Sequence, residues 1–211
     1  MNKKILQMKF IADNLYHIYN QGNNQQQIFS CSEDYMTFLR EIRIHISPNA
    51  EIVAYCLMPN HFHLMVYVDG RIDATIKQGG LILDPLTNGI RKLLSGYARI
   101  FNKRYNFSGS LFRQKTKSKC LSNIILQDAT KFSIQDHCIN CFQYIHQNPI
   151  TAKLVNRMED WEYSSFKDYA GLRNGSLCNK ELARKHCNYL KETFIKASHQ
   201  ITDKAFDNFF E

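Results

Sequence analysis

The stretch from Glu51 to Val68, EIVAYCLMPNHFHLMVYV, constrains the fold more than any other part of the chain. Its two apolar runs predict β-strands that meet at a short polar joint, Met58-Pro59-Asn60. Successive side chains of a strand point to opposite faces of the sheet. We therefore expect His61 and His63 to share one face, while Phe62 between them anchors in the core on the other.

Two imidazoles on one face, one pleat apart, are placed to share a divalent metal ion. The alternative is two ordinary half-buried histidines at the start of an alternating strand. The His-x-His pattern alone favours that alternative, because it is short and common. A second stretch, Cys141-Phe-Gln-Tyr144-Ile-His-Gln-Asn148-Pro149, changes the balance because it supplies further groups suited to the same chemistry.

Length and composition indicate a globular protein. A chain of 211 residues, 44% of them hydrophobic, can bury the core of one domain with additions or of two small domains. No apolar run reaches the length of a membrane span. The N-terminus, MNKKILQMKF, has no long apolar region and no small-residue cleavage site, so we expect no signal peptide. A cytoplasmic location with seven reduced cysteines follows as the expectation.

Two of the cysteines form the pair Cys138-x-x-Cys141, flanked by His137 and His146. A structural zinc site normally needs four ligands at recognisable spacing, so one pair with scattered histidines makes a weak case for zinc. We instead expect a helix whose buried stripe consists of Ile134, Cys138, Cys141 and Ile145.

The net charge of +8 is concentrated in one segment. Residues 71–131 contain twelve Lys and Arg and three Asp, a balance of +9, and the remaining fifteen basic and sixteen acidic residues give −1. Localised positive charge favours a polyanionic partner. The alternative is a solubilising surface.

Apolar spacing and capping residues predict the other elements. We expect a strand over 15–20, a helix over 33–45 capped by Ser32, a glycine-marked loop over 70–80, a helix over 88–104, a strand over 111–119, a helix capped by Ser133 and ended by Pro149, and further helix after 178, including 180–197. This order is the βαββαβ ferredoxin-like plan with an added helix. The predicted fold class is therefore α+β, with a mainly antiparallel sheet, helices on one face and a C-terminal helical extension.

The predicted strand over 111–119 carries four cations at period two, Arg113, Lys115, Lys117 and Lys119. Such a ribbon is either an exposed edge strand protected from aggregation by its charges or a track for a phosphate backbone. Most nearby aromatic side chains should be core, although some could stack on bases: Tyr97, Phe101, Tyr105, Phe107 and Phe112.

Tyr144 and Asn148 are four residues apart and share one face of their helix, on the same flank as His137. Taken separately, they suit packing and a helix end before proline. Taken with His61 and His63, they suggest a metal site of two imidazoles and one amide oxygen, with open positions for a phosphate oxygen. Tyr144 would then be placed to attack the phosphorus, helped by a cation because a phenol with a pKa near 10 is a poor nucleophile at neutral pH.

These segments resemble the single-tyrosine HUH transposases, in particular their REP-associated branch. One motif is Tyr55-Cys-Leu-Met-Pro-Asn-His61-Phe-His63-Leu-Met-Val66, and another is Tyr144-Ile-His-Gln-Asn148-Pro149 with Ala152 and Leu154-Val155. Shorter matches are Trp161-x-Tyr163-Ser164-Ser165-Phe166, Tyr16-His17 with Gly22-Asn23, and Gly109-x-Leu111-Phe112. The resemblance spans roughly residues 10–170 and departs at Gln21, where the family commonly has Arg before Gly-Asn.

The resemblance implies a metal-dependent transposase that cleaves and rejoins single-stranded DNA near hairpins through a 5′-phosphotyrosine intermediate. His61, His63 and Asn148 carry over as ligands of Mg²⁺ or Mn²⁺, and Tyr144 carries over as the nucleophile on the added, catalytic helix. Residues 1–170 would form the transposase-like domain, and residues 171–211 a helical extension of unknown role. The resemblance favours a monomer, with a homodimer as the alternative. We expect no small-molecule cofactor and no membrane partner.

We expect DNA to contact eight cations of the basic segment: Arg91, Arg99, Lys103, Arg104, Arg113, Lys115, Lys117 and Lys119. Two other functions stay open. One is a hairpin-DNA-binding protein without catalysis, which needs no metal. The other is a metal-dependent phosphohydrolase that uses water and forms no protein–DNA adduct.

Overall fold

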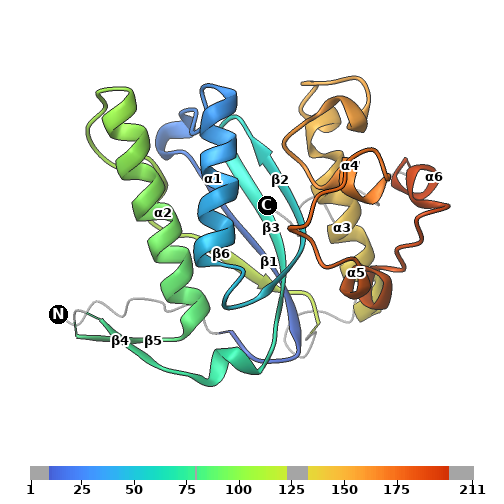
Figure 1. Ribbon diagram of the computed structural model, residues 1–211, viewed down its shortest axis with the longest axis horizontal. Helices are drawn as coiled ribbons and strands as arrows, with labels where there is room; N and C mark the ends of the chain where they lie inside the picture. The colour runs from blue at the N-terminus through green and yellow to red at the C-terminus, as the bar shows by residue number, and fades with distance from the viewer. Residues whose placement is uncertain (1–9, 79, 123–132, 200–211) are drawn as a thin grey trace.

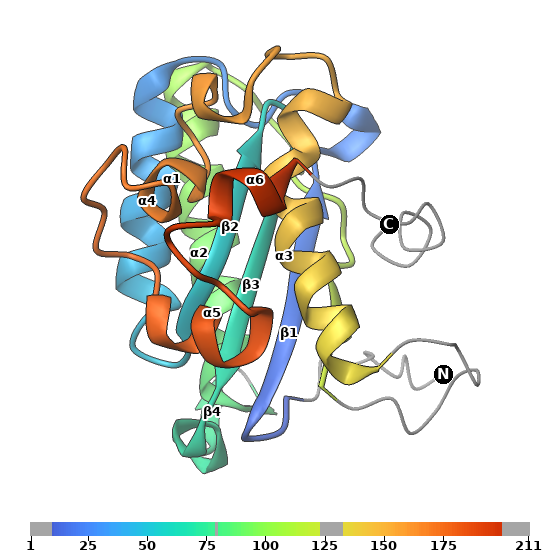
Figure 2. The ribbon, with the colours of Figure 1, turned by 90° about the vertical axis from the view of Figure 1, so that its right-hand side faces the viewer.

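A computed structural model describes residues 10–78, 80–122 and 133–199 of the chain. Lys131, at the end of the basic segment, lies outside the described residues, as do the N-terminal stretch up to residue 9 and the part of the predicted C-terminal extension after residue 199. The described chain is a three-layer arrangement, with a sheet between two helices on one side and a third helix on the other (Figures 1 and 2).

The central sheet has four antiparallel strands in the order β2-β3-β1-β6. They are β1 (Asn14–Gln21), β2 (Glu51–Met58), β3 (His61–Val68) and β6 (Lys117–Cys120). The turn between β2 and β3 is Pro59-Asn60, inside the predicted joint. β1 pairs with β3 along its whole length, from Asn14 opposite Val68 to Gln21 opposite His61.

Two helices, α1 (Ser32–His45) and α2 (Pro85–Arg104), cover one face of this sheet (Figure 1). α1 connects β1 to β2, and α2 lies between β3 and β6, which confirms the predicted βαββαβ order and α+β class. The core beneath them is apolar. Within it the Phe38 ring of α1 lies 5.1 Å from Phe62 of β3 and 5.0 Å from Tyr97 of α2, centroid to centroid.

Both helices begin earlier than predicted, because acidic side chains organise their first turns. Cys31 rather than Ser32 is the N-cap of α1, since the carboxylate of buried Asp34 accepts the Cys31 backbone N–H at 3.2 Å. α2 begins at Pro85 rather than residue 88. Asp84 accepts the Thr87 N–H at 2.7 Å, and proline suits the first helical position.

A third helix, α3 (Ile134–Thr151), covers the opposite face of the sheet (Figure 2), so the prediction that the helices lie on one face is wrong. Ser133 caps it, as predicted, by accepting the Asp136 N–H. Cys138, Cys141 and Ile145 line its buried stripe, which confirms that expectation. Ile134 is instead 47% exposed, because it is the first residue of the helix and lies a turn before the packed part begins.

Pro149 lies inside the last turn of α3, so the prediction that it ends the helix is wrong. The chain closes the helix beyond the proline. Lys153 N–H donates to Ile150 O at 2.8 Å and Leu154 N–H donates to Pro149 O at 2.9 Å. Lys153 has a left-handed φ of 56°, so the end is a Schellman motif. The additional residues extend the helix past Asn148.

The segment predicted as a loop contains a short helix η2 (Gly70–Asp73) and a hairpin of β4 (Ile76–Gln78) and β5 (Leu81–Leu83), so that prediction is wrong. Its turn includes Gly80 with φ of 77°, which the absence of a Cβ permits. The predicted strand over 111–119 is also wrong in extent, because only Lys117–Cys120 forms a strand.

After α3 the chain forms η3 (Met158–Asp160), α4 (Phe166–Tyr169), α5 (Lys180–Cys187) and α6 (Phe194–Ser198). A single helix over 180–197 is therefore wrong. Asn188, with a left-handed φ of 51°, ends α5. Cys187 and Phe194 pack with α3 in a second core on the α3 side of the sheet. In the described part of the chain, no helix has the length and apolar character needed to cross a membrane.

The segment between η3 and α5 also covers the outer edge of β2. Ser165 N–H donates to Tyr55 O at 3.0 Å, and Asn179 N–H donates to Ile52 O at 2.8 Å. A covered edge cannot pair with a strand of another chain.

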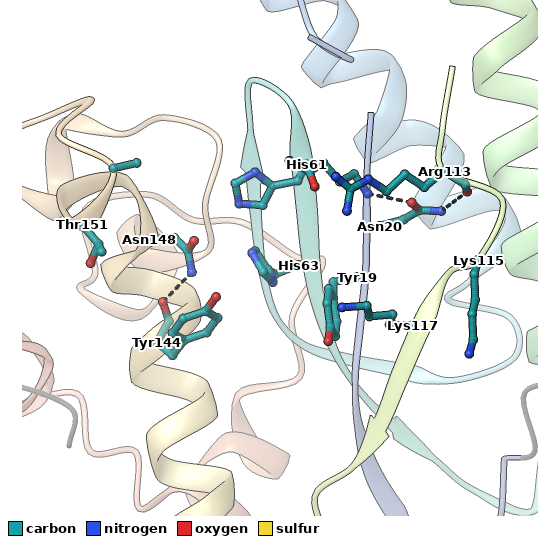
Figure 3. Close-up of a pocket in the computed structure, with 12 residues that line it drawn as sticks. Tyr19, Asn20, His61, His63, Arg113, Lys115, Lys117, Tyr144, Asn148 and Thr151 are labelled. Carbon is teal, nitrogen blue, oxygen red and sulfur yellow. Dashed lines mark hydrogen bonds between the residues drawn. The ribbon is translucent and has the colours of Figure 1, made fainter. Parts of the chain in front are cut away.

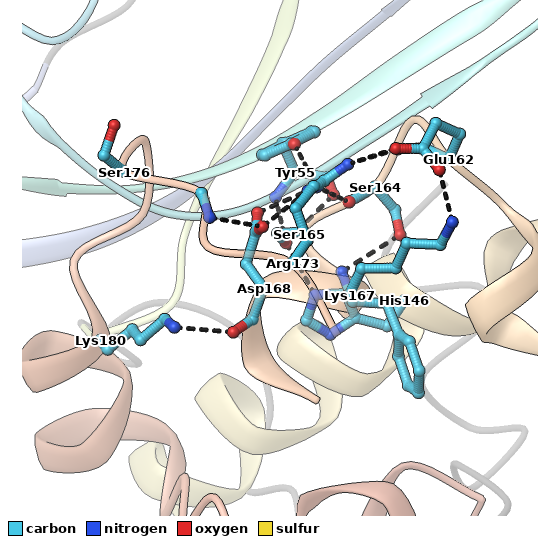
Figure 4. A network of polar contacts seen from close by, with 12 residues as sticks. Tyr55, His146, Glu162, Ser164, Ser165, Lys167, Asp168, Arg173, Ser176 and Lys180 are labelled. Carbon is cyan, nitrogen blue, oxygen red and sulfur yellow. Dashed lines mark hydrogen bonds and ion pairs between the residues drawn. The ribbon is translucent and has the colours of Figure 1, made fainter. Parts of the chain in front are cut away.

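A polar network holds this covering segment in place (Figure 4). Arg173 donates to the buried carboxylate of Asp168 at 2.7 Å and to the Tyr55 hydroxyl at 2.9 Å. His146 of α3 joins the same region through a 2.7 Å hydrogen bond to Ser165 Oγ. The network thus ties the segment both to β2 and to α3.

Candidate active site

β3 places two imidazoles on the sheet face that α3 covers. His61 and His63 point to this face and Phe62 packs into the opposite core, which confirms the predicted alternation. The two imidazole centroids are 4.9 Å apart. His63 is 3% exposed and His61 is half-buried, because His61 lies at the end of the strand next to the turn.

α3 brings Tyr144 and Asn148 to the same place. Figure 3 shows both side chains facing His61 and His63 across a cavity. The Tyr144 ring lies 5.4 Å from the His63 ring, centroid to centroid. Asn148 donates its amide Nδ2–H to Tyr144 O at 2.9 Å, so the amide is held in one orientation with its oxygen left as the acceptor.

The cavity between β3, β1 and α3 has a volume of about 520 Å³ and is open to solvent on one side. It is lined by Tyr19, Asn20, Gln21, His61, His63, Arg113, Lys115, Lys117, Tyr144, Asn148, Thr151 and Ala152. All four residues predicted for the metal and the nucleophile are therefore in one cavity. A volume of this size accommodates a small ligand or a nucleotide-sized group.

The hydrogen-bond partners of His61 and His63 indicate which nitrogen of each ring carries the proton and which has the lone pair. His61 Nδ1 lies 2.6 Å from Asn60 Oδ1. An amide oxygen only accepts, so His61 Nδ1 carries the proton and Nε2 has the lone pair. His63 Nδ1 lies 2.9 Å from Nε2 of His17, and His63 Nε2 is buried without a hydrogen-bond partner among the residues that the structure describes.

Burial keeps these imidazoles neutral. It lowers the pKa of His61, and the Asn148 side chain opposes that shift. Burial, reinforced by His17 and His61, lowers the pKa of His63 well below its ordinary value. Burial together with Lys119 lowers the pKa of His17 to about 3. Neutral imidazole is the form that ligates a metal.

These residues fit a divalent metal ion. His61 Nε2 and His63 Nε2 are imidazole donors, and the Asn148 amide oxygen is a hard oxygen donor of the kind that Mg²⁺ and Mn²⁺ accept. Within the described ranges, no three His, Cys, Asp or Glu side chains gather as a metal site. A metal ion held here would therefore take an amide oxygen as its third protein ligand. Cys138 and Cys141 belong to the apolar core instead.

The basic residues predicted to bind DNA divide into two groups. Arg113, Lys115 and Lys117 line the cavity, although the first two precede β6 rather than lying in it. Asn20 of β1 holds this segment, since its Nδ2 donates to Arg113 O at 3.1 Å and to Thr116 Oγ1 at 2.9 Å. Arg113 N–H also donates to Gln21 O at 2.9 Å, but the ladder with β1 includes only Lys117 to Cys120.

The remaining cations lie elsewhere. Arg91, Arg99, Lys103 and Arg104 are on α2, on the other face of the sheet (Figure 1). Arg104 is already engaged, with ion pairs to Glu33 and Asp34 of α1. Lys119 is on β6 opposite His17 in the β1 register and is half-buried. The positive charge is thus continuous in sequence but divided in space.

The aromatic side chains proposed for base stacking are not at the cavity. Tyr97, Phe101 and Phe112 are in the apolar core beneath α1 and α2. Tyr105 and Phe107 are exposed but do not line the cavity. Besides Tyr144, the cavity is lined by the aromatic ring of Tyr19. This ring stacks on His17, with centroids 4.7 Å apart, and the Lys117 ammonium lies 5.3 Å from its centroid.

Four residues of the site were not predicted from the sequence: His17, Tyr19, Asn20 and Asn60. The first three are in β1, and alternation along LYHIYN puts His17 and Tyr19 on one face. That signal was readable, but nothing in the sequence showed that this face meets β3 in the observed register. Gln21, which stands where the resemblance expects Arg, also lines the cavity.

Comparison with known proteins gives one kind of match. No protein-family model matches this chain, and no curated protein matches it. Among solved structures, the chain is similar to a REP-associated tyrosine transposase bound to a REP hairpin. The TM-score is 0.51 and the identity is 14%, over 85% of this chain and 94% of the other. At this identity the likeness shows a shared fold, in which an antiparallel sheet is combined with helices.

Proposed function

We propose that this protein is a metal-dependent DNA strand transferase that cleaves and rejoins single-stranded DNA near hairpins, with Tyr144 as the nucleophile. One observation carries the proposal. The fold brings the Tyr144 ring from α3 to 5.4 Å from the His63 ring of β3, in a cavity that also holds His61 and Asn148. Separately these residues have ordinary explanations, and together they supply a nucleophile beside three metal-ligating atoms.

In the proposed reaction, Tyr144 Oη attacks a backbone phosphorus. The Oη–P bond forms as the P–O3′ bond breaks, the phenol loses its proton and the 3′ oxygen takes one up. The DNA 5′ phosphate stays on the tyrosine, so a 3′ hydroxyl of another strand end can reverse the step and rejoin the DNA. A hydrolase that uses water forms no such covalent bond between the protein and the DNA, so it cannot rejoin the strand in this way.

His61, His63 and Asn148 are the residues that would hold a divalent cation, either Mg²⁺ or Mn²⁺. When bound there, the cation would offset the negative charge on the phosphate oxygens and so lower the barrier to attack by a phenol. Tyr144 itself is oriented by α3, whose first turn is capped by Ser133 and whose last turn closes beyond Pro149.

The cations at the cavity rim suit a DNA backbone. Arg113, Lys115 and Lys117 lie on one side of the cavity across from Tyr144 (Figure 3), where they can contact phosphates flanking the one under attack. The structural neighbour binds a DNA hairpin, which supports a hairpin as the substrate. The proposed site is assembled from α3 and β3 of a single chain and needs no residue of a second copy, so the proposed active unit is a monomer.

The test incubates the protein with labelled single-stranded hairpin oligonucleotides and Mn²⁺, and analyses the products on a denaturing gel. We expect a covalent protein–DNA band that disappears with EDTA and in Tyr144→Phe. An adduct that persists in Tyr144→Phe would refute the nucleophile. Tyr19→Phe, which removes another hydroxyl lining the cavity, serves as the control and should keep the adduct.

A second candidate function is hairpin binding without catalysis, favoured by the cationic rim and needing no metal. In that case hairpin affinity would be equal in Mn²⁺ and EDTA, and no strand would be cut with any hairpin supplied. Cut DNA without an adduct, over multiple turnovers, would indicate a phosphohydrolase instead.

A further inference from the structure

His17 is fully buried in β1 and forms a hydrogen bond with His63 of the candidate site. Its Nε2 lies 2.9 Å from Nδ1 of His63, and the two rings are nearly parallel, with centroids 5.1 Å apart. In the β1–β3 register His17 is opposite Met65, and Tyr19 is opposite His63. The two imidazoles are therefore diagonal neighbours on one face of the sheet, held by the backbone ladder on both sides.

A hydrogen bond between two neutral imidazoles can run in either direction, and the directions have opposite consequences. If His17 donates, His63 Nδ1 accepts and His63 Nε2 carries the proton. That nitrogen then has no lone pair and cannot ligate a metal. If His63 Nδ1–H donates to His17 Nε2, the lone pair of His63 is on Nε2, the atom that has no hydrogen-bond partner among the described residues.

The surroundings favour neutral rings in this pair. Both are fully or almost fully buried, and the charged group facing His17 from β6 is the cation Lys119, which disfavours a second positive charge. The other imidazole, His61, provides a comparison within the same site. Asn60 Oδ1 fixes its proton on Nδ1, which leaves Nε2 for a ligand.

We propose that His17 is a positioning residue for the candidate metal site: it accepts the His63 Nδ1–H, fixes the proton there, and leaves the His63 Nε2 lone pair for the metal. It acts on His63 as Asn60 acts on His61. The part of this inference that concerns the metal rests on the proposed function, whereas the position of the His63 proton does not. Partners of this kind are typically worth 10- to 100-fold in metal affinity.

The direct test measures side-chain nitrogen chemical shifts of the histidines in the metal-free, full-length protein by ¹⁵N NMR at pH 7. We expect His63 with its proton on Nδ1. A His63 signal with the proton on Nε2 would overturn the proposal. This readout requires no variant, no metal and no DNA, so it stays informative even if no adduct ever forms.

Variants test the consequence. His17→Phe keeps an aromatic ring but removes the acceptor, and we expect Mn²⁺ affinity, measured by electron paramagnetic resonance, to fall 10- to 100-fold. His17→Gln restores an acceptor oxygen and should recover most of the affinity. His137→Phe, which changes a buried histidine away from the cavity, is the matched control and should bind Mn²⁺ as wild type does.

Two results separate the inferences. Unchanged Mn²⁺ affinity in a folded His17→Phe protein would overturn the role of His17, even if Tyr144 forms its adduct. If His17→Phe does not fold, as judged by circular dichroism, the position of the His63 proton in the wild-type protein decides the question. The absence of any adduct, with the expected proton position and Mn²⁺ binding, would count against the proposed reaction only.

Discussion

The two faces of the sheet are made from alternate residues of the same strands, yet they are held together differently. Under α1 and α2 the strands contribute apolar side chains such as Ile18, Phe62 and Leu64. Under α3 the same strands contribute His17 and His63 as well as apolar residues. One face is held mainly by packing, and the other combines packing with buried hydrogen bonds.

The difference shows how a small sheet separates stability from chemistry. A buried imidazole loses its hydration, so it is tolerated where it has a hydrogen-bond partner. On the α3 side His63 has His17 at 2.9 Å and His146 has Ser165 Oγ at 2.7 Å. We therefore expect changes on the α1–α2 side to affect the free energy of unfolding, and changes on the α3 side to affect the reaction.

The largest expected effect is on the α3 side. His61→Ala removes a proposed metal ligand that is half-buried at the end of β3, so DNA cleavage should fall by at least about 10²-fold, given that outer partners of metal ligands alone are worth 10–100-fold. Stability should change by only about 1 kcal/mol or less, as for a partly exposed site. Adduct formation rates and urea denaturation measure the two effects, and a near-normal rate would contradict the assignment.

Phe62→Ala probes the opposite face at the next residue. The ring is buried against Phe38, so its loss should lower the free energy of unfolding by about 3–5 kcal/mol. The adduct rate, measured at low temperature on the folded fraction, should stay within a few-fold of wild type. Phe62→Leu, a milder change, should lower the free energy of unfolding less and also leave the adduct rate near that of wild type. A large loss of adduct rate without a loss of stability would contradict the division of roles between the two faces of the sheet.

Acid should weaken the α3 side. Burial lowers the pKa of His146 from 6.5 to about 3. Between these values the unfolded chain binds a proton that the folded chain does not. The free energy of unfolding is therefore not reduced by His146 above about pH 6.5. As the pH falls from 6.5 toward 3, it declines by up to about 1.4 kcal/mol per pH unit. Urea denaturation at pH 7 and pH 5 should show a smaller loss in His146→Gln than in wild type, and equal losses would exclude this source.

The smallest expected effect distinguishes the two groups of cations. Lys115→Gln, at the cavity rim, should weaken hairpin binding for all sequences and reduce the slope of log K against log salt by about 1. Arg99→Gln, an exposed residue of α2 on the other side of the sheet, should leave the slope unchanged. Fluorescence titrations at several salt concentrations measure both. Equal effects would mean that DNA also contacts α2.

Much of the fold was readable from local patterns. Alternation in β3 predicts which neighbours of Phe62 share a face, and helical spacing predicts that Tyr144 and Asn148 lie together, because both depend only on residues close in sequence. Helix ends were less predictable. Pro149 did not stop α3 and Ser32 did not cap α1, since the Schellman closure and the Asp34 carboxylate outweighed the simpler signals.

The sequence by itself therefore determined the βαββαβ order of the central elements, the α+β class and the residue types suited to metal and phosphate chemistry. Only the tertiary structure decided that β1 lies beside β3 in the register that joins His17 to His63. It also separated the rim cations Arg113 and Lys115 from those of α2, although both groups belong to one basic segment. The physical reason is that register and layer depend on packing and hydrogen bonds between residues far apart in the chain, which no local pattern encodes.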